Sequence, residues 1–161
     1  MKKSAVFDRY LQLNPLAKGN IEISILILTG IISLIFNFAR IPLYPVINIA
    51  GIFVLLFSLV LHFLCERHHK AAHSNTQDIE KIVTSGIYGR LRHPIYLSLI
   101  MMYLAVALMF NSWMVLFFSL IFSVSWGFTA VKEEEILINK FGVEYEAYKR
   151  DVRWRIIPGI F

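Results

Sequence analysis

Arg92, His93 and Pro94 combine a permanent cation, a titratable imidazole and a proline in three consecutive positions. Proline is favoured at the first position of a helix, so we predict that a helix begins at Pro94. Unpaired backbone N–H groups and the positive end of the helix dipole would then lie beside Arg92 and His93, where a carboxylate or a phosphate could bind. The simpler alternative is that Arg92 anchors to lipid phosphates.

Three consecutive carboxylates, Glu133 to Glu135, directly follow an apolar stretch and Lys132. Negative charge in this place opposes the excess of Lys and Arg that usually flanks a membrane helix. A cation held by a carboxylate would explain it, either a cationic ligand or the arginines of the first segment. A solvated helix face is the alternative. We take Glu133, Glu134 and Arg92 as the candidate catalytic residues.

The elements that must position these residues are membrane helices. The chain has 161 residues, of which 57% are hydrophobic and 17% charged, and its mean hydropathy is +0.62, well away from the soluble average. Four apolar stretches are each long enough to cross a bilayer at about 1.5 Å per residue; they cover about 22–39, 44–65, 94–110 and 113–131. We expect an all-α, polytopic transmembrane helical bundle of about four spans. It would form one integral membrane domain over residues 1–161.

The distribution of basic residues predicts the orientation of the bundle. Fifteen of the 16 Lys and Arg residues precede the first span or lie in the loop 66–93 or the tail 132–161, and Arg40 is the exception. The positive-inside rule then places both termini, the loop and the tail in the cytoplasm. We expect the plasma membrane of a prokaryote. No basic run indicates binding to nucleic acid.

Five short motifs occur in order along the second half of the chain. They are Thr-Ser-Gly-Ile-Tyr at 84–88, Arg-His-Pro-Ile-Tyr at 92–96, Glu133-Glu134, Phe-Gly-x-Glu-Tyr-x-x-Tyr at 141–148 and Ile157-Pro158. Taken together, they resemble the isoprenylcysteine carboxyl methyltransferase family. A lone Arg-His-Pro would be weak, but the ordered set is specific.

The resemblance implies an integral membrane enzyme that binds S-adenosylmethionine without a Rossmann fold, at a cytoplasmic site built from helix ends and loops. Its acceptor would be lipid-borne or lipophilic, with an isoprenylcysteine-type carboxylate as the family's example, and its other partners would be membrane lipids. No metal is implied. Carried over by motif position, the cofactor-binding residues would be Glu80, Lys81, Ile82, Val83, Tyr88, His93, Pro94, Ile95, Tyr96 and Glu133. The first four would line the adenosine side.

Thr129 departs from the family pattern. The family has an arginine four residues before the glutamate at position 133, on the same helix face, and this arginine is thought to hold the substrate carboxylate. Arg90, Arg92 and Lys132 are the replacements that the sequence offers. The departure leaves the cofactor half of the site intact and favours the alternative of a phospholipid amine N-methyltransferase.

Three further alternatives stay open. A sterol-type reductase using NADPH resembles this region, but such relatives read His-Pro-Asn-Tyr where this chain has Ile95. A non-catalytic membrane protein is a second alternative. The third is a metal site at His68, His69 and His73, of which the last two are one helical turn apart. Because no second shell of ligand partners is visible, we interpret these histidines as water-facing.

Overall fold

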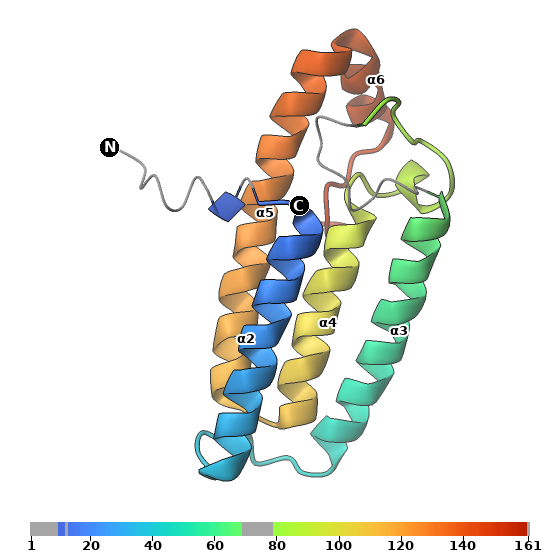
Figure 1. Ribbon diagram of the computed structural model, residues 1–161. Coiled ribbons are helices and arrows are strands. Elements are labelled where there is room, and N and C mark those ends of the chain that lie inside the picture. The colour runs from blue at the N-terminus through green and yellow to red at the C-terminus, as the bar shows by residue number, and fades with distance from the viewer. Residues whose placement is uncertain (1–9, 12, 69–78, 161) are drawn as a thin grey trace.

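The computed structural model describes residues 10–11, 13–68 and 79–160, and the regular structure in this part of the chain is helical (Figure 1). The elements are α2 (Pro15–Ile35), α3 (Val46–His68), the 3-10 helix η2 (Gly86–Gly89), α4 (Pro94–Phe110), α5 (Trp113–Phe141) and α6 (Val143–Asp151). The prediction of an all-α bundle is confirmed.

Helices α2, α3, α4 and α5 run side by side, and α4 packs against each of the other three. Helix α5 projects beyond its neighbours, and α6 folds back from this projecting end (Figure 1). The segment that precedes α4 lies at the same end of the bundle. The helices therefore bring the two polar segments of the sequence to one end of the molecule.

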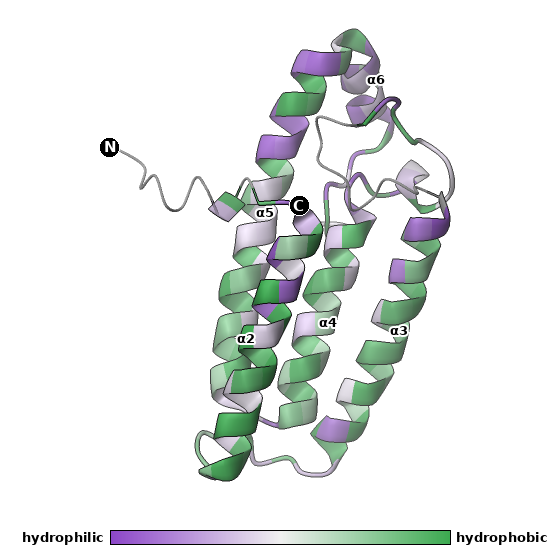
Figure 2. Cartoon of the chain, in the orientation of Figure 1, coloured by the Kyte–Doolittle hydropathy of each residue, from purple (hydrophilic) through white to green (hydrophobic). Residues whose placement is uncertain are grey.

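Three of the helices, α2, α3 and α5, are long and apolar enough to cross a membrane, and α4 is a shorter apolar helix of 17 residues. Apolar residues cover most of the bundle, while hydrophilic residues gather at the end that carries α6 (Figure 2). Large side chains such as Phe53 and Phe57 on α3 are more than half exposed. Such surface is suited to lipid rather than water, and the chain is an integral membrane protein.

The first helix differs from the predicted span at 22–39, because α2 covers Pro15–Ile35. Asn14 caps it by accepting a hydrogen bond from the backbone N–H of Leu16 at 2.9 Å, and proline suits the first helical position. The predicted span began at about Glu22, where the uninterrupted apolar run starts. Capping extends the helix upstream instead, so Lys18 also lies inside α2.

The turn predicted at Asn111-Ser112 is confirmed. Asn111 ends α4 in the left-handed conformation with φ of 53°, which asparagine tolerates better than most residues. Ser112 then caps α5, accepting from the backbone N–H of Val115 at 3.5 Å. The new helix runs without interruption through the three glutamates to Phe141, which sets their side chains at helical angles to one another.

The tail after α6 returns to the start of α4. Gly142, with φ of 55°, joins α5 to α6, a conformation that glycine adopts without steric cost. The backbone N–H of Arg92 donates to the carbonyl of Trp154 at 3.0 Å, and that of His93 donates to the carbonyl of Arg155 at 2.8 Å. Two segments about sixty residues apart are thus fixed side by side next to the glutamates of α5.

Candidate active site

Glu134 lies at the centre of a cluster of cationic side chains. Its Oε1 is 2.7 Å from Nε of Arg92 and 3.3 Å from Nε2 of His93, and its Oε2 is 3.0 Å from Nη2 of Arg155. The Glu134 side chain is 3% exposed. A carboxylate buried to this degree needs such partners, because desolvation of an unpaired charge is costly.

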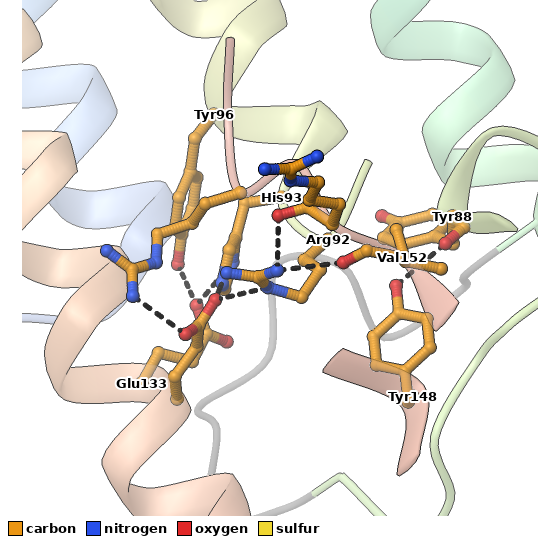
Figure 3. A network of polar contacts seen from close by, with 10 residues as sticks. Tyr88, Arg92, His93, Tyr96, Glu133, Tyr148 and Val152 are labelled. Atoms are coloured by element: carbon orange, nitrogen blue, oxygen red, sulfur yellow. Dashed lines mark hydrogen bonds and ion pairs between the residues drawn. The ribbon is translucent and has the colours of Figure 1, made fainter. Parts of the chain in front are cut away.

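Arg92 joins three parts of the chain in one guanidinium. In addition to its bond to Glu134 on α5, its Nη1 donates to the carbonyls of Val152 and Arg153, each at 2.8 Å (Figure 3). The planar fork of arginine suits such fixed, multiple contacts. Arg92 therefore holds the tail and the start of α4 against α5.

Glu133 shares His93 with Glu134 but has Tyr96 in place of the two arginines. The Tyr96 hydroxyl donates to Oε2 of Glu133 at 2.5 Å, and Nδ1 of His93 lies 3.4 Å from the same oxygen (Figure 3). The His93 and Tyr96 rings stack at 5.2 Å between centroids. Burial disfavours the charged imidazole, but the hydrogen bonds and negative charges of Glu133 and Glu134 outweigh it, so the pKa of His93 is raised above its ordinary value.

A pocket opens beside Glu133 and encloses about 590 Å³ when the part open to solvent is counted. Its walls are mainly aromatic and aliphatic, with one carboxylate and three basic side chains among them. The lining residues are Ile79, Lys81, Ile82, Val83, Tyr88, Arg92, His93, Ile95, Tyr96, Glu133, Leu137, Tyr145 and Tyr148. This composition suits a ligand that has both a flat apolar part and charged groups.

Three of the wall tyrosines belong to the loop and to α6. The Tyr148 hydroxyl donates to the carbonyl of Tyr88 at 2.7 Å, and the Tyr145 and Tyr148 rings lie 5.7 Å apart. Burial, the largest cause, raises the pKa of Tyr88, Tyr145 and Tyr148. They remain neutral phenols and offer ring faces and hydrogen bonds rather than charge.

The structure brings together most of the residues that the sequence singled out for the cofactor. Those that line the pocket are Lys81, Ile82, Val83, Tyr88, His93, Ile95, Tyr96 and Glu133. Glu80 is exposed and Pro94 is buried, and neither is among the lining residues. Of the candidate catalytic residues, Glu133 and Arg92 line the pocket, whereas Glu134 is buried behind it.

Sequence reasoning gave no role to Tyr145, Tyr148 or Arg155. The two tyrosines stand three positions apart in α6 and so share one helix face, a signal that was present in the motif at 141–148. No comparable signal marked Arg155, because only the return of the tail brings it to Glu134.

Thr129 has a partner that the sequence did not suggest. Its hydroxyl accepts a hydrogen bond from Nζ of Lys18 at 2.7 Å. Lys18 belongs to α2, whereas the expected replacements lie in the loop before α4 and on α5. The alternative of a metal site cannot be followed, because His69 and His73 lie outside the described residues; within the described residues, no group of three metal-ligating side chains occurs.

Fold and site together define a helical integral membrane protein with a polar ligand pocket at one end of its bundle. The model of the phospholipid methyltransferase family matches residues 46–144, more than half of the chain, and the protein belongs to this family. The family is of the same group of integral membrane methyltransferases as the isoprenylcysteine carboxyl methyltransferases, so the resemblance seen in the motifs is confirmed. The protein is thus a membrane methyltransferase for lipid-type substrates.

Proposed function

We propose that the protein transfers a methyl group from S-adenosylmethionine to the headgroup amine of a phospholipid. The observation that carries the proposal is the pocket beside Glu133, which combines a carboxylate with aromatic walls at the hydrophilic end of a membrane bundle. A water-soluble cofactor could enter there from the aqueous side, while a lipid acceptor arrives from the bilayer.

The residues present fit this cofactor. Ile82, Val83 and the ring of Tyr88 offer apolar surface for an adenine. Glu133 offers the negative charge that a sulfonium or an ammonium group needs, and Lys81 offers a cation for a carboxylate. When bound, the cofactor would supply an electrophilic methyl group.

The contribution of the chain itself is to bind, orient and exclude water. Glu133 is held by Tyr96 and His93 on the pocket wall, so its charge is fixed before any ligand binds. The neutral tyrosines close the sides of the pocket. Holding donor and acceptor in line within such walls supplies the orientation on which methyl transfer depends.

Two observations support an amine acceptor over an isoprenylcysteine-type carboxylate. The family match is to the phospholipid methyltransferases, and Thr129 stands where the carboxylate-binding arginine would be expected. An amine carries no negative charge that such an arginine would have to neutralise. The carboxylate remains the second candidate, because Lys18 places a cation next to Thr129.

We also propose that both termini face the cytoplasm of a prokaryotic cell. The distribution of Lys and Arg along the sequence, with Arg40 alone at the opposite end, supports this orientation. The cofactor pocket would then open to the compartment in which S-adenosylmethionine is made.

Calorimetry in detergent and a methyl-transfer assay test the proposal together. Wild-type protein should bind S-adenosylmethionine and not NADPH, and should transfer labelled methyl groups to an aminophospholipid. Glu133→Gln should weaken cofactor binding about 10-fold or more, because it removes the charge from the pocket. The exposed Glu135→Gln is the matched control and should behave as wild type. Equal binding by both variants would refute the role of Glu133.

Binding without transfer to any lipid would overturn the enzymatic proposal and favour a non-catalytic membrane protein. Transfer to a prenylated cysteine analogue in place of the aminophospholipid would establish the second candidate. Binding of NADPH but not of S-adenosylmethionine would instead favour the reductase.

A further inference from the structure

Lys18 and Glu22 lie one turn apart on the face of α2 that is turned into the bundle. Both are 0% exposed, and hydrophilic residues interrupt the otherwise apolar sequence along the upper part of the α2 ribbon (Figure 2). Ionisable residues buried in a membrane helix are costly and are retained for a reason. Packing of α2 alone therefore does not explain why two ionisable residues are buried here.

Glu22 is fully provided with hydrogen bonds. Its donors are the hydroxyls of Tyr103 at 2.6 Å and Ser125 at 3.2 Å, Nε1 of Trp126 at 2.7 Å, and the hydroxyl of Tyr10. Four donors on two oxygens satisfy a buried carboxylate without a cation. Through these hydrogen bonds Glu22 links α2 to α4 and α5.

Lys18 makes fewer hydrogen bonds than its ammonium group can donate. An ammonium has three donors, and within the described chain Nζ of Lys18 has one hydrogen-bond acceptor, Oγ1 of Thr129 at 2.7 Å. The rest of its surroundings are ring faces, Trp126 at 4.1 Å and Tyr10 at 5.0 Å to the centroids. Ring faces attract a cation but leave its remaining N–H groups without an oxygen. The ammonium therefore has hydrogen-bonding capacity left for a further oxygen.

The ammonium lies close to the proposed methyl-transfer pocket. Thr129 precedes Glu133 by one turn of α5, on the same helix face. The Trp126 ring beneath Lys18 packs against Tyr96 at 4.7 Å between centroids, and Tyr96 is the donor to Glu133. The rings of Trp126 and Tyr96 therefore lie between the buried cation and Glu133 on the pocket wall.

We propose that Lys18, together with Thr129, binds the phosphate of the phospholipid acceptor and so positions its headgroup amine at the pocket. This inference rests on the proposed function and names how the acceptor is held. The phosphate supplies the oxygens that the ammonium lacks, and the flexible stem of lysine lets the charge follow the headgroup. Lys18 is in this sense a substrate-binding residue contributed by the first helix.

The kinetic experiment compares Lys18→Met with three acceptors: an aminophospholipid, the same glycerophospho headgroup without acyl chains, and a long-chain amine without phosphate. The KM for both phosphate-bearing acceptors should rise about 10- to 100-fold, the loss expected for a charge-assisted hydrogen bond. The KM for the phosphate-free amine and the affinity for S-adenosylmethionine should not change. Lys18→Arg keeps the positive charge, so its KM for the phosphate-bearing acceptors should stay close to the wild-type value. The exposed Lys140→Met should behave as wild type.

Two outcomes of this experiment overturn the inference and leave the proposed function standing. One is an unchanged KM for phospholipid in Lys18→Met. The other is an equal loss with the phosphate-free amine and in cofactor affinity, which would make Lys18 a purely structural residue. If only the acyl-free headgroup is affected, Lys18 binds soluble phosphate compounds and the lipid assignment is wrong.

A second measurement does not depend on methyl transfer. Native mass spectrometry of the detergent-purified protein should show bound phospholipid in wild type and in Lys140→Met, and much less of it in Lys18→Met and Thr129→Val. Equal retention of phospholipid by wild type and Lys18→Met overturns the inference whether or not the protein methylates lipids. Loss in Lys18→Met from a protein that binds no S-adenosylmethionine would sustain the lipid site and refute the proposed reaction.

Discussion

The Tyr96 hydroxyl on the first turn of α4 donates a 2.5 Å hydrogen bond to Oε2 of Glu133 on α5. The two residues are 37 positions apart, and both line the pocket. Because the bond spans the helices that form the pocket wall, it fixes the direction in which the carboxylate points. A fixed carboxylate costs less to reorganise when a cationic ligand binds.

Replacing Tyr96 by Phe should therefore weaken the binding of S-adenosylmethionine while leaving the fold intact. The change removes one hydrogen bond to a charged group and keeps the ring stacked on His93. We expect the Kd to rise about tenfold, measured by calorimetry in detergent. Tyr44→Phe is the matched control, since Tyr44 is 75% exposed. An unchanged Kd in Tyr96→Phe would show that Glu133 does not need this support.

Glu134→Gln should lower the stability of the protein rather than its affinity for ligand. The substitution leaves the guanidinium groups of Arg92 and Arg155 without their carboxylate in a buried cluster. Removing one partner of a buried ion pair costs about 3–5 kcal/mol. Thermal unfolding in detergent should show a marked drop in Tm.

The neighbouring Glu135 provides the control for Glu134. It is exposed, so Glu135→Gln should change the free energy of unfolding by no more than about 0.5 kcal/mol. If Glu134→Gln unfolds at the same temperature as Glu135→Gln, the cluster does not hold the tail against α5.

The stability of the protein should fall as the pH rises above neutral, in part because of His93. Its pKa is raised in the folded protein by Glu133 and Glu134, which outweigh burial, relative to about 6.5 in an unfolded chain. The contribution of His93 is thus complete below about pH 6.5 and is lost as the pH rises through the folded-state pKa. Tm measured from pH 6 to 10 should fall less steeply in His93→Gln. Parallel profiles for the two proteins would contradict the raised pKa.

The fold could be predicted from the sequence because the signals that determine it are local. Apolar length predicted the helices, Pro94 predicted the start of α4, and Asn111-Ser112 predicted the turn before α5. The beginning of α2 was predicted wrongly, since the count of charges began the span at about residue 22 and left Lys18 outside the helix. The spacing of four residues from Lys18 to Glu22, continued by Leu26 and Gly30, was the signal that they share an inward face.

Only those residues of the candidate site that belong to the sequence motifs could be predicted. Most of the predicted cofactor residues do meet in one pocket, and the exceptions are Glu80 and Pro94. Arg155 and Lys18 could not be found in this way, because their contacts with Glu134 and Thr129 depend on how distant segments fold back. Such long-range contacts leave no periodic trace in a single sequence.

The close contact of α3 with α4 at Gly51 predicts a substitution of large effect far from the pocket. A Cβ at position 51 would lie 2.9 Å from the backbone nitrogen of Met109. Because a backbone atom cannot move aside as a side chain can, Gly51→Ala should force the helices apart at a cost of about 1–3 kcal/mol.

Gly19 on α2 provides the control, because the nearest atom to a new Cβ at this position is 3.9 Å away. Gly19→Ala should be neutral or stabilising by up to about 1 kcal/mol, because alanine favours the helix. Unfolding by a denaturing detergent should thus show destabilisation in Gly51→Ala and none in Gly19→Ala; stabilisation by Gly51→Ala would mean that α3 and α4 do not pack as closely as described.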